Sequence, residues 1–197
     1  VFNQAFVDLA DKIVRDDGDI SRQQAMELAH AGPDLTMDLI ALAGKIRQRF
    51  KQKEVFKCAI INAKSGMCPE DCAFCAQSAH HQTEVQTYAM LDADELEQTG
   101  LDMAAAGATN YSIVTSGTNL NTSEIDTVCR VARNLKRKTD LTLCASVGLL
   151  TAQGARELKQ AGITRYHHNL ETARSHFEYI CTTHDYEDDI ETIRLAQ

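Results

Sequence analysis

The stretch Ser65-Gly66-Met67-Cys68-Pro69-Glu70-Asp71-Cys72-Ala73-Phe74-Cys75-Ala76-Gln77-Ser78 places three cysteines at C-x3-C-x2-C spacing. Structural zinc takes four protein ligands, usually as two separated cysteine or histidine pairs, and no second pair lies nearby in the sequence. An iron-sulfur cubane that is bound by three thiolates leaves one iron open for a ligand that is not protein. Cys68, Cys72 and Cys75 are therefore predicted to bind a 4Fe-4S cluster with one open iron.

Two other interpretations of these cysteines stay open, namely structural zinc and disulfide-bonded or inert thiols. The chain has seven cysteines, which is an odd number, whereas a disulfide framework favours an even one. The ligand count and the odd total together favour the open cubane.

The sequence around the loop alternates between strands and helices. Val55 to Asn62 is apolar and β-branched enough for a buried parallel strand that leads into the loop. Further strands are predicted at 108–115, 141–147 and 163–171, and helices at 92–106, 122–136, 151–161, 175–180 and 187–196. Strand-helix units with short connections indicate a parallel sheet, either doubly wound or closed as a barrel.

Each strand after the loop has one polar face. Thr142, Cys144 and Ser146 share one face of the strand at 141–147, and the opposite face is apolar. Helices cover both faces of a doubly wound sheet, whereas a barrel can direct a polar face to a lumen that holds a ligand. We therefore expect a (β/α)8 TIM-type barrel. An antiparallel sheet with one exposed face is the alternative, which the helical connections disfavour.

The chain contains about four strand-helix units, half of a barrel that typically needs ~250 residues. An open edge strand is a pairing hazard, so we expect residues after Gln197, or a second copy of the chain, to close the sheet. Two regions are expected: an N-terminal helical region at 1–50 and the N-terminal half of the barrel at 51–197. In the first, Leu9 and Ile13 belong to a helical stripe, and Ser21 with Gln24 is typical of a capping box.

Composition excludes several classes of function. The net charge is -8, so no basic surface indicates nucleic acid, and no apolar run approaches the ~18 residues of a membrane span. No signal-peptide pattern starts at Val1, and reduced cysteines suit the cytoplasm, which is the expected location.

The sequence also resembles known proteins. The C-x3-C-x-aromatic-C pattern of Cys68, Cys72, Phe74 and Cys75 resembles the radical S-adenosylmethionine (SAM) superfamily. Three stretches are similar to the biotin synthase family in particular: 62–78, the segment Arg165-Tyr166-His167-His168-Asn169-Leu170-Glu171-Thr172, and the segment Thr182-Thr183-His184-Asp185-Tyr186. This resemblance implies a radical SAM barrel that converts dethiobiotin to biotin by inserting sulfur at unactivated carbons.

The resemblance also implies roles for single residues. Phe74 would lie against the adenine of SAM, although packing of the loop is an equal alternative. Gly117, after the second strand, would allow backbone to approach the methionyl amino group. Asn169 and Glu171 would contact SAM and dethiobiotin. His167 stands at a substrate-facing position where the family usually has Asn, and His184 stands where Arg is common.

An auxiliary 2Fe-2S cluster is the sulfur donor in the resembled family. Cys144 matches its ligand on the third strand, whereas Ser112 replaces the cysteine expected on the second. A serine oxygen is a poor iron ligand beside thiolates, which predicts an auxiliary cluster of altered type. Our hypothesis is that Cys181 supplies the replacement thiolate.

The resemblance further implies reduction by a flavodoxin or ferredoxin and a homodimer. Two alternatives stay open at this stage. One is another radical SAM enzyme of the same branch, of the methylornithine synthase or hydrogenase maturase type. The other is a non-catalytic iron-sulfur or zinc-binding module.

Overall fold

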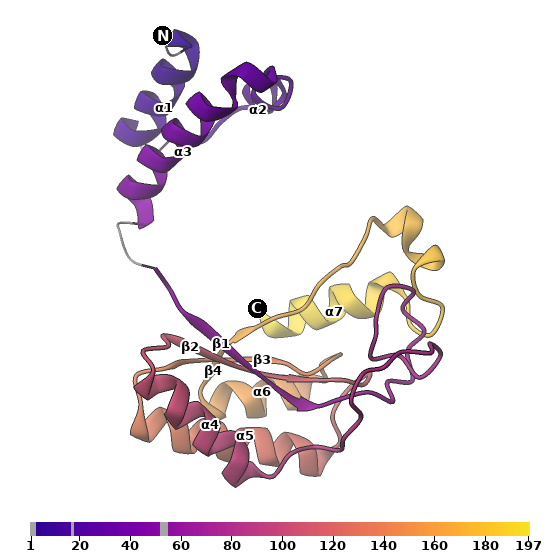
Figure 1. The fold of residues 1–197 in the computed structure, drawn as a ribbon. Helices are drawn as coiled ribbons and strands as arrows, with labels where there is room; N and C mark the ends of the chain where they lie inside the picture. The colour runs from indigo at the N-terminus through magenta and orange to yellow at the C-terminus, as the bar shows by residue number, and fades with distance from the viewer. Residues whose placement is uncertain (1–2, 17, 52–54) are drawn as a thin grey trace. The chain divides into compact units, whose positions relative to one another are not determined.

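The computed structural model describes residues 3–16, 18–51 and 55–197, which fall into two compact units, Val1–Val55 and Phe56–Gln197 (Figure 1). The predicted regional boundary at 50/51 falls at the end of helix α3, which spans Thr36–Lys51. Among the described helices, none combines the length and the apolarity that crossing a membrane requires.

The first unit is helical. It consists of α1 (Gln4–Asp16), α2 (Arg22–Ala29), a 3-10 turn η1 (Pro33–Leu35) and α3. The predicted capping box opens α2: the Gln24 N–H donates to Ser21 Oγ, and the Ser21 N–H donates to Gln24 Oε1. Apolar side chains of α1, including Leu9 and Ile13, line one cavity with side chains of α3. The predicted stripe is therefore a packing surface.

The second unit is a four-stranded parallel sheet in the order β1-β2-β3-β4. Its strands are β1 (Cys58–Lys64), β2 (Asn110–Thr115), β3 (Thr142–Ser146) and β4 (Ile163–Tyr166). Its helices are α4 (Ala93–Ala105), α5 (Thr122–Lys138), α6 (Ala152–Ala161) and α7 (Tyr186–Ala196), with a 3-10 segment η2 (Arg174–Tyr179) before α7. The unit has the consecutive strand-helix order of a partial TIM-type barrel, as predicted.

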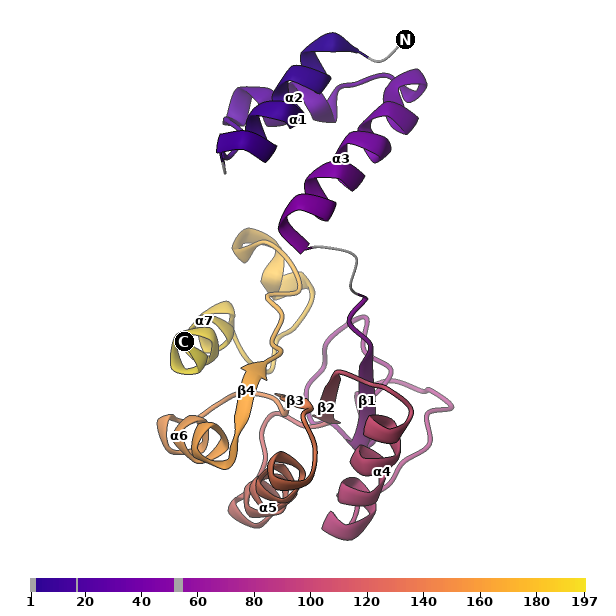
Figure 2. The same ribbon diagram turned by 90° about the vertical axis from the view of Figure 1, so that its left-hand side faces the viewer.

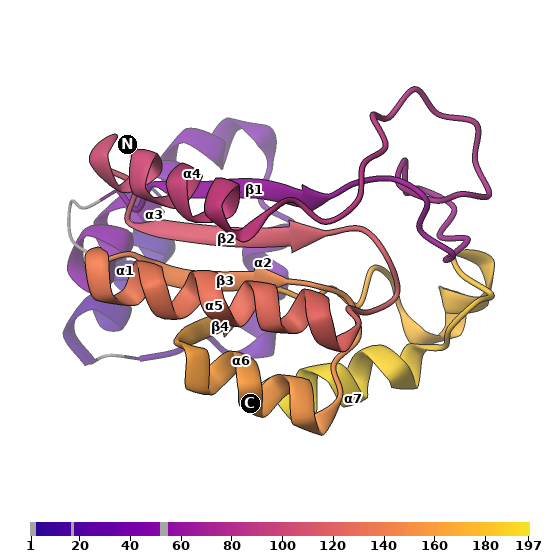
Figure 3. The same ribbon diagram turned by 90° about the horizontal axis from the view of Figure 1, so that it is seen from below.

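The helices α4, α5 and α6, each of which connects two neighbouring strands, lie on one side of the sheet (Figures 2 and 3). Local chemistry sets their ends. The Asn121 side chain accepts from the Glu124 N–H to cap α5, and Thr151 caps α6 in the same way through the Gly154 N–H. Gly162 ends α6 in the left-handed conformation that glycine adopts without strain.

The sheet separates its side chains into two faces. On the helix-covered side, Tyr111 and Ile113 of β2 join Leu143 and Ala145 of β3 in a buried core with Leu135 of α5 and other helix residues. On the other side, Ser112 pairs in register with Cys144, and Cys144 with Arg165. The predicted division into an apolar and a polar face is confirmed for β2 and β3.

Two of the four predicted strands are wrong by more than two residues at one end. The first strand covers Cys58–Lys64 instead of 55–62, and the fourth ends at Tyr166 instead of Glu171. The fourth strand stops because its partner β3 ends at Ser146, and the His167 N–H makes the last bond, to the Ala145 carbonyl. Glu171 then has a φ of 57°, which is incompatible with an extended strand. Asn169 and Glu171 therefore lie in a loop beyond the strand.

The loops at the carboxyl ends of β2 and β3 pack closely at Gly148, and a substitution there tests this contact. Its φ is 83°, and a Cβ atom there would lie 2.2 Å from the Thr118 carbonyl oxygen. We expect Gly148→Ala to lower the free energy of unfolding by about 2–5 kcal/mol, from left-handed strain and overpacking together. Urea denaturation monitored by circular dichroism measures this loss.

Gly107→Ala is the matched control. Gly107 has a similar φ of 85°, but its added Cβ would meet only Lys57 Nζ, at 3.5 Å. It should cost about 1–2 kcal/mol, from strain alone. Equal losses in the two variants would contradict the predicted close approach.

Candidate functional site

The cysteine loop begins directly after β1 and is held by its own backbone. Ser65 and Tyr88 exchange two backbone hydrogen bonds of 3.1 and 3.0 Å. The Cys68 N–H donates to the Gln77 carbonyl at 3.0 Å, and the Cys75 N–H donates to the Cys72 carbonyl at 3.0 Å. The loop therefore folds back on itself, which brings its three cysteines together at the carboxyl end of the strand.

The three cysteines line a cavity of about 320 Å³ beside the ends of the strands. Residues that follow β2, β3 and β4 form the other walls. Among the lining residues are eight that the sequence singled out, namely Cys68, Cys72, Cys75, Gly117, His167, Asn169, Glu171 and His184. In a barrel with parallel strands, ligand sites form at this end. The structure thus places the cysteine loop and the predicted polar residues around one space.

Phe74, Cys144 and Cys181 do not line this cavity. Phe74 is 58% exposed, so its ring does not face the cavity in which the adenine of SAM was expected. Cys144 is buried on the polar face of β3, in register with Ser112 and Arg165. Burial raises the pKa of the Cys144 thiol.

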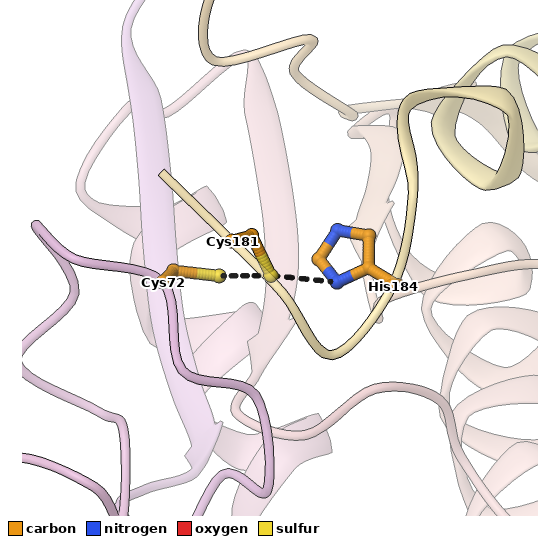
Figure 4. Close-up of side chains that lie close together, drawn as sticks. All are labelled: Cys72, Cys181 and His184. Atoms are coloured by element: carbon orange, nitrogen blue, oxygen red, sulfur yellow. Dashed lines mark hydrogen bonds between the residues drawn. The ribbon is translucent and has the colours of Figure 1, made fainter. Parts of the chain in front are cut away.

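Cys181 lies beside the cysteine loop instead of beside Cys144. Its Sγ is 3.8 Å from Cys72 Sγ and 3.2 Å from His184 Nδ1 (Figure 4). Burial, together with the neighbouring Cys181, raises the pKa of the Cys72 thiol to about 12. These contacts give no support to the hypothesis that Cys181 shares a cluster with Cys144.

Two carboxylates of the cysteine loop fasten it to the segment that follows η2. Asp71 accepts from the Thr182 backbone N–H at 2.8 Å and from the Thr182 hydroxyl, and these bonds lower the pKa of Asp71. Glu70 accepts from Thr118 and Thr183 and lies 2.7 Å from His184 Nδ1. Burial opposes ionisation of Glu70, but these hydrogen bonds outweigh it and lower its pKa.

A second histidine-carboxylate pair forms another part of the cavity wall. His168 Nε2 lies 2.8 Å from Asp189 Oδ1, and Asp189 is 3% exposed. Burial raises the pKa of Asp189, although His168 partly offsets the effect. Its Oδ2 atom is buried and has no hydrogen-bond partner among the described residues. In the loop after β4, Asn169 Nδ2 donates to Glu171 Oε1 at 3.0 Å, which orients the Asn169 amide.

Sequence reasoning assigned no role to Glu70, Asp71, His168 or Asp189. Glu70 and Asp71 could have been found from the sequence, because two carboxylates between predicted cluster ligands are expected to have a structural or functional role. Asp189 could not have been found in this way, since it lies among the other acidic residues of the first turn of α7 and only its burial distinguishes it.

The fold and the site define a class of protein. The family model of the Radical SAM superfamily matches residues 63–197, so the chain belongs to this superfamily. Within it, the chain is similar to biotin synthases. It is 49% identical over 191 residues to the biotin synthase of Syntrophus aciditrophicus (strain SB), covering 96% of this chain and 58% of that protein. It is 47% identical over 178 residues to that of Nitratidesulfovibrio vulgaris (strain DP4), covering 90% and 49%.

The chain thus spans about half to three-fifths of the length of these relatives. Solved structures agree on the fold. Methylornithine synthase (PylB) superposes with a TM-score of 0.78 at 16% identity, over 95% of this chain and 55% of that one. The FeFe-hydrogenase maturase HydG from Carboxydothermus hydrogenoformans superposes with a TM-score of 0.75 at 14% identity, over 98% and 45%.

The link between Asp71 and Thr182 yields a prediction about pH and order. We expect Asp71→Asn to accelerate hydrogen exchange of the Thr182 amide, because the neutral amide accepts hydrogen bonds more weakly than a carboxylate. In the unmodified protein the pKa of Asp71 is lowered, so protection persists at neutral pH. It is lost as the pH falls below the ordinary aspartate value of 3.8 and through the lower folded value.

Protection factors from hydrogen-exchange mass spectrometry, followed across pH, measure both effects. Asp140→Asn is the matched control, because Asp140 is exposed before β3 and has no described contact with this segment. An unchanged Thr182 protection factor in Asp71→Asn would refute the link.

Proposed function

We propose that this chain carries the cluster-binding and SAM-binding part of a biotin synthase, which inserts sulfur into dethiobiotin. One observation carries the proposal: the three loop cysteines line a single cavity together with Asn169 and Glu171. Identities of 40–49% to curated biotin synthases, over most of this chain, support the choice of reaction within the superfamily.

The side chains present fit a 4Fe-4S cluster. Cys68, Cys72 and Cys75 are all free thiols, they share one loop, and they face one cavity. Three thiolates would hold three irons and leave the fourth for SAM. With SAM bound, such a cluster supplies the radical chemistry that removes hydrogen from an unactivated carbon.

The remaining residues of the cavity would bind and orient the ligands. Asn169 would offer its amide, held by Glu171, to the ribose of SAM and to polar groups of dethiobiotin. Gly117, with a φ of 106°, lines the cavity and would bring backbone close to the methionyl group. His167 would face the substrate from the same wall, and Phe74 would cover the adenine only if the loop turned its exposed ring inward.

An auxiliary iron-sulfur cluster is the proposed sulfur donor, with Cys144 as one of its ligands. Cys144 lies on the polar face of the sheet, 1% exposed, next to Ser112. The Ser112 hydroxyl lies 3.5 Å from His167 Nδ1, so we expect this serine to hydrogen-bond to His167 and not to bind iron. This favours a cluster other than the usual 2Fe-2S type.

Ser112 also favours a second candidate function. If no sulfur donor assembles, the same cavity would serve another radical SAM enzyme of this branch, such as a methylornithine synthase or a hydrogenase maturase. That enzyme would cleave SAM reductively and transfer no sulfur. In either function, a flavodoxin or ferredoxin would supply the electron, the protein would act as a homodimer, and its free thiols would suit the cytoplasm.

Reconstitution tests the proposed function. The natural full-length protein, loaded anaerobically with iron and sulfide and given reductant, SAM and dethiobiotin, should form biotin detectable by mass spectrometry. Cys68→Ala, Cys72→Ala and Cys75→Ala should each abolish both biotin and 5'-deoxyadenosine, because each removes one of three cluster thiolates. Formation of 5'-deoxyadenosine without biotin in the unmodified protein would favour the second candidate.

The auxiliary cluster has its own test. Cys144→Ala should remove the iron of the auxiliary cluster. The 4Fe-4S cluster on the cysteine loop should remain and still cleave SAM. Cys129→Ala is the matched control, since Cys129 is equally buried but lies in the apolar core. Iron analysis with Mössbauer spectroscopy measures both. Loss of the same iron in both variants would mean general destabilisation and would remove Cys144 from the ligand set.

A further inference from the structure

Three metal-binding side chains meet at the edge of the cavity. Cys72 comes from the cysteine loop, while Cys181 and His184 come from the segment between η2 and α7 (Figure 4). Their two sulfur atoms and one imidazole nitrogen all lie within 4.8 Å of one another. Two of these residues belong to no part of the proposed 4Fe-4S site.

The distances between these atoms fit a single tetrahedral ion. With Zn–S bonds near 2.3 Å, two thiolates on one tetrahedral zinc lie about 3.8 Å apart. The Cys72 and Cys181 sulfur atoms are 3.8 Å apart. A zinc-bound sulfur and imidazole nitrogen lie about 3.5 Å apart on the same reasoning. The observed distance between Cys181 Sγ and His184 Nδ1 is 3.2 Å, which a small rotation corrects.

The two ring nitrogens of His184 point to different groups. Its Nδ1 atom faces Cys181, and its Nε2 atom lies on the side of the buried Asp189 carboxylate, at 3.7 Å, which is longer than a hydrogen bond. A metal-binding histidine usually directs its second nitrogen to a carboxylate, which fixes the ring. Glu70 Oε2 lies 2.7 Å from Nδ1, but Glu70 is not among the side chains whose ligand atoms all lie within 4.8 Å of one another, which leaves the fourth coordination position to water.

The segment that carries these ligands is already positioned. The Cys181 N–H donates to the Phe177 carbonyl at 2.9 Å, and Asp71 holds Thr182 through its backbone and its hydroxyl. Cys181 is 3% exposed. These contacts hold Cys181 and His184 beside Cys72, and none of them involves the thiol of Cys68 or Cys75.

We propose that Cys72, Cys181 and His184, with water in the fourth position, bind a zinc ion when the chain lacks its iron-sulfur cluster. Binding releases the two thiol protons to solvent and forms two zinc-thiolate bonds. Cys72 cannot serve zinc and the cubane at once, so the two metal states exclude each other. This exclusion rests on the proposed function, whereas the zinc site itself does not.

Cobalt titration tests the site, because Co²⁺ occupies zinc sites and gives visible bands and thiolate charge-transfer absorption. The probe is Co²⁺ added anaerobically to the full-length, cluster-free protein, followed by displacement with Zn²⁺. We expect a tetrahedral cobalt spectrum with two thiolate ligands. Cys181→Ser should weaken binding about 100-fold, as loss of one of a few strong ligands would. His184→Gln, a second variant that keeps both thiols, should weaken it similarly.

Two controls separate this site from the cysteine loop. The double variant Cys68→Ser/Cys75→Ser removes two cubane ligands and should keep the cobalt spectrum. Cys129→Ser removes an unrelated buried thiol and should also keep it. Retention of the spectrum in Cys181→Ser, or its loss in Cys68→Ser/Cys75→Ser, would overturn the proposal.

Cluster assembly tests the exclusion. Zinc-loaded unmodified protein should resist reconstitution with iron and sulfide, while Cys181→Ser treated with the same zinc should assemble its cluster. Equal assembly in both would overturn the exclusion. Absence of a cluster even in zinc-free protein would count against the proposed function, and the cobalt spectra would still decide the zinc site.

Discussion

Successive side chains of a strand point to opposite faces, and in this chain that alternation separates a dry core from a reactive space. Tyr111 and Ile113 of β2 are buried with the helices, so Ser112 between them must face the other way. The same holds for Cys144 on β3. Because all four strands run parallel, their carboxyl ends meet at one edge, and the cysteine loop opens there. A shift by one residue in any strand would exchange the two faces.

The cavity depends equally on contacts between distant parts of the chain. Glu70 and Asp71 accept hydrogen bonds from Thr182 and Thr183, more than one hundred residues later. The same two carboxylates lie between predicted cluster ligands. The loop that would hold the cluster is therefore shaped partly by the segment that carries Cys181 and His184, which couples the two candidate metal sites.

The sequence predicted the features that depend on local patterns. Strand-helix alternation, the capping box at Ser21 and the polar face containing Cys144 all follow from spacing and residue type, and the structure has them. Three short motifs indicated the family. The end of β4 was missed because it depends on where β3 stops, and the neighbours of Cys181 were missed because a contact with Cys72 spans 109 residues. The burial of Asp189 was equally invisible, since Glu187 and Asp188 directly before it are also acidic but exposed.

The bond between Asp71 and Thr182 closes a loop of 111 residues, and this has a consequence for synthesis on the ribosome. At ~5–20 residues per second, Thr182 is made roughly 6–22 s after Asp71. During that interval the cysteine loop leaves the ribosome without the partners that shape it. Delivery of iron and sulfide to the nascent chain would therefore meet three cysteines on an incompletely held loop, and a well-formed site becomes available only once the chain has grown past His184.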